Sequence, residues 1–163
     1  MKRILSFVLV LALFLSLSAC GEKNTLSVDI VEKEFDGLDD IYNGTLFIDA
    51  SDGIVKEFTY VLKDINGENL LDRTFVNDAV TALVSGDANI TSSQMNTAKI
   101  LPLFMSIELL LVPGEEDLPL DNVIEKMLDS VCDGKKVKYE GGWTVISEVD
   151  QEDNTLTITA YFK

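Results

Sequence analysis

The sequence of 163 residues predicts an α+β domain in which an antiparallel sheet packs against about three helices. Two segments support this fold class. Residues 155–162 place apolar and hydroxyl-bearing side chains alternately, as expected for a half-buried strand. Residues 100–112 are almost entirely apolar, and at 13 residues they are too short to span a membrane, so we expect a buried central helix. The sheet is expected to combine an N-terminal meander with C-terminal hairpins.

The N-terminal part of the domain predicts the first strands of this meander. Residues 26–35 alternate imperfectly between apolar and polar side chains, and residues 45–49 form a second, shorter strand. Asp36-Gly37 is expected to break the first strand, and Ser51-Asp52-Gly53 to turn the chain after the second.

Residues 54–63 are compatible with two predictions. Their enrichment in Ile, Val, Phe, Thr and Tyr favours a strand. Their apolar positions also fit one face of a helix, so a helix over residues 52–66 that ends at Gly67 remains an alternative. In the strand interpretation, Asn66-Gly67 suits a hairpin turn, and residues 69–76 are expected to return as the next strand.

Two helices are predicted from their terminal residues and their apolar faces. Residues 78–85 follow Asn77, a favourable N-cap, and precede Gly86, which is expected to end the helix. Residues 121–132 carry apolar side chains at helical spacing, and Gly134 follows as a stop.

A third, longer helix is expected to contain the apolar segment. It begins at Ser92 or Ser93 as its N-cap and runs to about Val112. Pro102 removes a backbone hydrogen bond and should therefore kink or restart this helix. Pro113-Gly114 is expected to end it.

The C-terminal third predicts three strands. These are residues 136–140, 143–149 and 155–162. Gly141-Gly142 is expected to form a turn or bulge between the first two, and residues 150–154 a loop between the last two.

The first 20 residues have the features of a secretory signal. A basic start is followed by an apolar stretch from Ile4 to Leu17, and small residues come next. The four residues Leu17-Ser18-Ala19-Cys20 resemble the lipobox of bacterial lipoprotein precursors. This resemblance implies that the chain is cut before Cys20 and that the Cys20 sulfur carries a diacylglycerol. The alternative is an ordinary signal peptide with a cysteine near its end.

These features divide the chain into a signal peptide (1–19), a lipidated tether (20–25) and one α+β domain (26–163). Without the leader, the formal net charge of −15 becomes −17, because the leader contains two basic residues and no acidic one. So negative a domain is not expected to bind nucleic acid, which requires Lys and Arg at phosphates. It is also not expected to lie flat on an anionic membrane.

The sequence contains no histidine, which limits the chemistry available to it. Ser-His-Asp and Cys-His catalysis and histidine metal ligation are excluded. With Cys20 lipidated, Cys132 is the one thiol, and it is expected to be a small core residue with no disulfide partner in the chain.

Acidic clusters in turns are candidates for calcium sites, because calcium binds several carboxylate oxygens. Their spacing matches no EF-hand loop, and Asp64-x-Asn66-Gly67 places its glycine too early. We therefore expect solvated turn carboxylates. The clusters are Asp36 with Asp39 and Asp40, Asp49 with Asp52, and Asp150 with Glu152, Asp153 and Asn154.

Three aromatic residues of the C-terminal strands are candidates for a binding surface. These are Tyr139, Trp143 and Tyr161. Trp143 is expected to pack in the core instead, and Tyr161 is the better candidate for exposure.

Together these features predict a lipoprotein anchored by Cys20 at the extracytoplasmic face of the cell membrane. Its domain is expected to bind without catalysis, to another envelope protein, and without a cofactor or metal. Two alternatives remain, a carrier of a small apolar ligand and a carboxylate-dependent envelope enzyme. The oligomeric state and the identity of the partner are not predicted.

Overall fold

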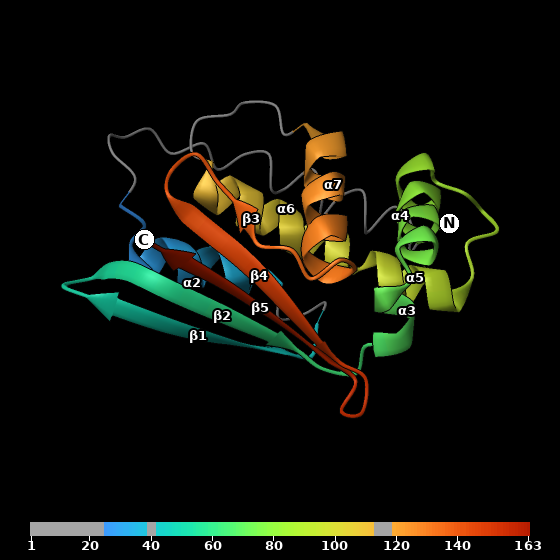
Figure 1. Cartoon of the computed structure of the whole chain (residues 1–163), viewed down its shortest axis with the longest axis horizontal. Coiled ribbons are helices and arrows are strands. Elements are labelled where there is room, and N and C mark those ends of the chain that lie inside the picture. Colours follow the sequence, from blue (N-terminus) through green and yellow to red (C-terminus); the bar gives the residue numbers. More distant parts are fainter. Residues whose placement is uncertain (1–24, 39–41, 113–118) are drawn as a thin grey trace.

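The computed structural model describes residues 25–38, 42–112 and 119–163, which form an α+β fold as predicted (Figure 1). All neighbouring strands are antiparallel, and their order across the sheet is β1-β2-β5-β4-β3. The strands are β1 (Gly44–Ser51), β2 (Ile54–Leu62), β3 (Val137–Lys138), β4 (Trp143–Asp150) and β5 (Thr155–Phe162). The helices are α2 (Val28–Asp36), α3 (Gly67–Leu71), α4 (Arg73–Ser85), α5 (Ser92–Ala98), α6 (Ile100–Leu111) and α7 (Leu120–Val131).

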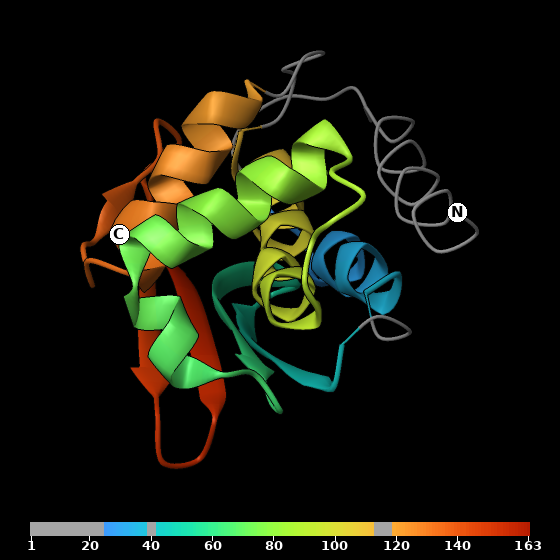
Figure 2. The ribbon, with the colours of Figure 1, turned by 90° about the vertical axis from the view of Figure 1, so that its right-hand side faces the viewer.

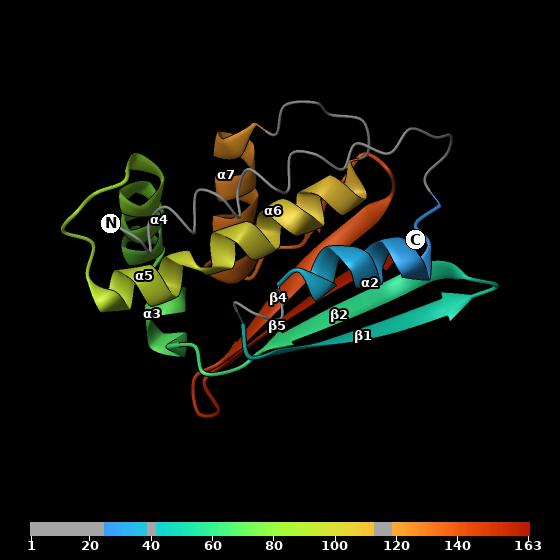
Figure 3. The same cartoon turned by 180° about the vertical axis from the view of Figure 1, so that it is seen from behind.

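The helices cover one face of the sheet, as Figures 1 and 3 show from opposite sides. Strand β5 shows the difference between the covered face and the open face of the sheet. Its residues Leu156, Ile158 and Ala160 are fully buried under the helices, whereas Thr159 and Tyr161 on the other face are only partly buried. Helices α3, α4 and α5 gather at the end of the sheet where β2 ends, and Figure 2 views the molecule from that end, with α4 lying across α6 and beside α7.

Helix α6 forms the centre of the core. All of its residues except Leu109 are buried, which confirms the predicted central helix. Pro102 is the third residue of α6, where its missing N–H has no intrahelical acceptor, so the proline is compatible with the first turn. The predicted long helix is therefore divided at Lys99 into α5 and α6. Thr91, instead of Ser92 or Ser93, is the N-cap of α5.

The predicted strand over residues 26–35 is wrong, because the chain forms helix α2 from Val28 to Asp36. Its buried residues Val31 and Phe35, followed by Leu38, lie at helical spacing and pack on the sheet and α6. The predicted end at Asp36-Gly37 is confirmed.

The predicted hairpin turn at Asn66-Gly67 and the strand over residues 69–76 are also wrong. The Asn66 side chain accepts a hydrogen bond from the Asn69 backbone N–H at 3.2 Å and so begins α3. Asp72 accepts one from the Phe75 N–H at 3.0 Å and begins α4. Helix α4 thus starts before the predicted N-cap Asn77, because both polar residues act as helix caps.

Other predicted elements are close to the observed ones. The predicted strand over residues 54–63 is β2 (Ile54–Leu62), so the helical alternative over residues 52–66 is wrong. Gly86, with a φ of 70°, ends α4, and α7 and β5 match their predicted ranges closely. Strand β3 has only two residues, because the chain turns back from Tyr139 to Gly142. About three helices were expected, and the described residues contain six, since two predicted strands are helical and one predicted helix is divided.

Several predictions lie outside the described residues. These are the signal peptide, Cys20, the residues Asp39 and Asp40, and the helix end at Pro113-Gly114.

Candidate functional site

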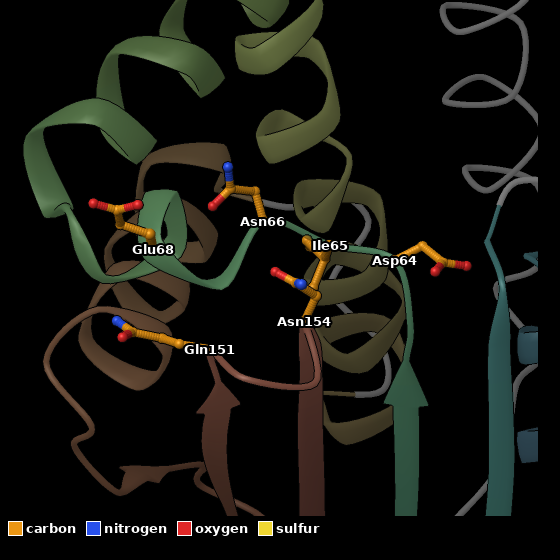
Figure 4. Close-up of a pocket in the computed structure, with 6 residues that line it drawn as sticks. All are labelled: Asp64, Ile65, Asn66, Glu68, Gln151 and Asn154. Atoms are coloured by element: carbon orange, nitrogen blue, oxygen red, sulfur yellow. The ribbon is translucent and has the colours of Figure 1, made fainter.

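The candidate site is an open depression at the end of the sheet where β2 meets the β4–β5 loop (Figure 4). Two segments far apart in the sequence form it. The chain after β2 contributes one side and the loop before β5 contributes the other. The lining residues are Asp64, Ile65, Asn66, Glu68, Gln151 and Asn154.

Two residues with left-handed backbone conformations shape this depression. Asp64 has a φ of 60° and Asn154 a φ of 51°, and Asx residues adopt this conformation more readily than most. The Ile65 N–H donates to the Asn154 carbonyl oxygen at 3.1 Å, which joins the two segments. The Asn43 side-chain amide donates to the Asp64 carboxylate. These contacts hold both sides of the depression in place.

Gly67 allows the start of α3 to approach the β4–β5 loop closely. A Cβ atom at this position would lie 3.1 Å from the Gln151 Cα and 3.2 Å from the Asp150 carbonyl oxygen. Beneath the rim, the buried Ile65 anchors the segment in the core.

The chemistry of the depression is that of polar recognition. Its rim carries the carboxylates of Asp64 and Glu68 and the amides of Asn66, Gln151 and Asn154, and most of these residues are exposed. The amides can donate and accept hydrogen bonds, and the carboxylates accept them from cationic or N–H groups. Such a surface can bind a polar group of a partner.

The acidic β4–β5 loop uses its first carboxylate internally. Asp150 accepts hydrogen bonds from the N–H groups of Glu152, at 2.9 Å, and Asp153, at 3.1 Å. Within the part of the chain that the structure describes, no group of three or more Cys, Asp or Glu side chains is arranged to hold a metal ion.

A second polar cluster is buried between helices and contains an ion pair. Glu108 of α6 is 2% exposed, and the Lys126 Nζ donates to its Oε1 at 2.5 Å from α7. The same Nζ lies 4.3 Å from the centre of the Tyr139 ring. Burial, together with the negative charge of Glu108, raises the pKa of the Tyr139 phenol well above its usual range. The cluster links α6, α7 and the β3–β4 turn.

Helix α6 makes a further polar contact on its other side. Glu34 of α2 is buried against Ser106, and burial raises the pKa of the Glu34 carboxyl, while Ser106 and Lys33 partly offset this rise. The two polar side chains of α6 thus face partners on neighbouring helices: Ser106 faces Glu34 of α2, and Glu108 faces Lys126 of α7.

The surface of α4 and α7 is joined by a charged network around Arg73. Its guanidinium contacts Glu125 at 2.7 Å, Asp129 at 3.0 Å and Asp133 at 2.6 Å. Lys135 contacts Asp129 and Asp133 in turn, and its hydrogen bond is the main cause that lowers the pKa of Asp129. These pairs are partly exposed and mainly position α7 against α4.

Cys132 and the aromatic candidates are placed largely as predicted. The Cys132 side chain packs partly buried against the core, and burial raises the pKa of its thiol to about 11. Trp143 is 3% exposed and contacts Phe58 and Phe162, which confirms its place in the core, and Tyr139 is buried too. Tyr161 is partly buried on the open face of the sheet.

The depression and the buried ion pair were not predicted from the sequence. The polar residues of segments 64–66 and 150–154 are evident in the sequence, but nothing in it places the two segments together. The sequence shows Glu108 inside the apolar segment, but nothing in it indicates that Lys126, 18 residues later, is its partner.

Comparisons with family models, with curated proteins and with solved structures find no match to this chain. Among the described helices, none has both the length and the apolar character needed to cross a bilayer.

Proposed function

We propose that this protein is a lipoprotein, anchored through Cys20 at the extracytoplasmic face of the cell membrane, whose domain binds another envelope protein without catalysis. The observation that carries the proposal is the lipobox-like sequence Leu17-Ser18-Ala19-Cys20 next to the start of a folded domain. The Val55 N–H donates to the Leu26 carbonyl oxygen at 2.8 Å, so the described fold includes Leu26, six residues after Cys20.

The depression supports a role in binding. It offers several side-chain amides and carboxylates on a rim whose two sides are joined by the backbone hydrogen bond from Ile65 to Asn154. Specific protein interfaces have a polar rim of this kind. A partner that presents Lys, Arg or backbone N–H groups fits this chemistry best.

The anchor is tested with Cys20→Ala in the cell that produces the protein. Mass spectrometry of the wild-type protein should detect a diacylglycerol on an N-terminal Cys20, and the variant should remain uncut or be released into the medium. A wild-type protein that keeps residues 1–19 and carries no lipid would show that the anchor proposal is wrong.

The binding role is tested by crosslinking in intact membranes. A photo-reactive residue at Gln151 should yield one defined crosslinked protein, and Glu68→Lys should abolish that product by reversing a rim charge. A photo-reactive residue at the exposed Asp87, in the loop after α4, is the matched control. If positions 151 and 87 give the same products, the depression is not the binding surface. Apolar ligand that copurifies with the protein would instead favour the carrier function.

A further inference from the structure

The chain enters the fold at one end of the sheet, and the depression lies at the other. Ser27 pairs with Ile54 at the start of β2, beside the Ser51-Asp52-Gly53 turn, whereas the depression begins just after Leu62. Figures 1 and 3 show the start of α2 and the C-terminus at the same end, opposite the β4–β5 loop.

The tether is short compared with the sheet. Leu26 lies six residues after Cys20, so the chain between them spans at most about 20 Å. The nine residues of β2 extend over about 30 Å. A lipid on Cys20 therefore keeps the end of the sheet at which the chain enters close to the bilayer.

This end carries exposed apolar side chains and two lysines. Ile30 is 50% exposed, Ile54 is 37% exposed and Phe162 is 42% exposed. Phe162 belongs to this end because Tyr161 pairs with Glu57, three residues after Ile54. Lys56 and Lys163 accompany them, as do the carboxylates of Asp29, Asp49, Asp52 and Glu57. We call Ile30, Ile54, Phe162, Lys56 and Lys163 the anchor-end surface.

We infer that the anchor-end surface rests on the lipid headgroups, so that the domain stands end-on and holds the depression away from the membrane. This inference rests on the proposed lipidation of Cys20. The apolar side chains enter the interface, and the lysines extend toward the phosphates. The net charge of −17 without the leader opposes a flat orientation on anionic lipid, and the end-on orientation brings only this small surface to the bilayer.

The orientation is tested with spin labels on the lipidated protein in phosphatidylcholine vesicles. Labels are placed at Ser51→Cys and at Gln151→Cys, both exposed, in a Cys132→Ser background. The label at position 51 should be shielded from a water-soluble nickel reagent and accessible to oxygen, whereas the label at position 151 should stay accessible to nickel. Equal nickel accessibility at both positions overturns the inference.

A second measurement tests the apolar contact itself. Ile30→Ser with Ile54→Ser should raise the nickel accessibility of the label at position 51. Val84→Ser is the matched control, because Val84 on α4 is also 50% exposed but lies outside the anchor-end surface. The inference is wrong if the Ile30/Ile54 variant behaves like the control.

Mass spectrometry of the same samples separates the two proposals. If Cys20 carries no lipid, the anchor proposal fails and the end-on orientation fails with it. If Cys20 is lipidated and the labels do not differ, only the orientation is overturned. Vesicles with added phosphatidylglycerol should leave the order of the two labels unchanged, and a reversed order also overturns the end-on orientation.

Discussion

Replacing Lys126 with methionine should destabilise the domain by leaving the buried Glu108 carboxylate without its cation. Removing one partner of a buried ion pair typically costs about 3–5 kcal/mol. The Lys126 side chain is 29% exposed, so water can partly replace it, and we expect a loss of about 2–3 kcal/mol. Methionine keeps an apolar contact with the Tyr139 ring, which limits the effect to the lost charge.

The assay is urea unfolding followed by the fluorescence of Trp143, the single tryptophan, which is 3% exposed in the folded state. Lys136→Met, at an exposed lysine, is the control and should change the free energy of unfolding by less than about 0.5 kcal/mol. The double variant Glu108→Met with Lys126→Met should recover most of the stability, because two apolar side chains of suitable volume can replace a buried pair.

Two results would refute this reasoning. If Lys126→Met costs no more than Lys136→Met, Glu108 does not depend on its lysine partner. If the double variant is less stable than Lys126→Met alone, Glu108 contributes by some route other than the ion pair.

Three further predictions concern single residues. Gly44→Ala should lower the free energy of unfolding by about 2–3 kcal/mol, because the added Cβ would overlap the buried Tyr60 hydroxyl. Gly86→Ala is the control in the same urea assay and should cost only about 1 kcal/mol, since Gly86 has a φ of 70° but open space around it. Equal losses would contradict the overlap at Gly44. Glu34→Gln should stabilise the domain at pH 7.5 and lose this advantage toward pH 4. The folded-state pKa of the Glu34 carboxyl is raised, so this group contributes stability below its unfolded-state pKa, and that stability is lost as the pH rises. A gain that does not depend on pH would contradict this prediction. Cys132 should react with a maleimide slowly at pH 7.5, because a pKa of about 11 leaves about 100-fold less thiolate than a pKa of 9, and rapid labelling of the folded protein would show that the thiol is accessible and ionised.

The strands and the central helix could be predicted because burial leaves a local pattern. Strand β5 is buried on one face, so its side chains alternate, and α6 is buried nearly all round, so its sequence is continuously apolar. Both patterns reflect only which faces of a strand or helix are buried, so they can be read from the local sequence.

The error at α2 has a physical reason. Val31 and Phe35 mark one helical face, but Ile30 and Val28 add apolar residues beside it and make the segment look like an imperfect strand. Ile30 is half exposed, so the sequence pattern overstated the apolar content that the fold buries. The error at residues 69–76 has a different origin, because Asn66 favours a turn and a helix cap equally well.

The candidate site could not be predicted because it depends on the pairing of β2 with β5. Thr59 and Thr159, whose hydroxyls are 3.0 Å apart, face each other across this pair and are separated by 100 residues. No local pattern in either strand specifies its neighbour. The contact between the Ile65 N–H and the Asn154 carbonyl oxygen, and with it the depression, follows only once that pairing exists.

The same pairing relates the depression to the proposed anchor. Strand β2 starts where Ser27 brings the chain into the sheet and ends at the segment that lines the depression. Strand β5 is antiparallel to it, so the loop before β5 must lie at the far end and Phe162 at the near end. The length of one strand, about 30 Å, therefore separates the polar rim from the residues next to the tether. A lipid at Cys20 and a binding surface at the β4–β5 loop thus require no change in the fold to act on the membrane and on a partner at the same time.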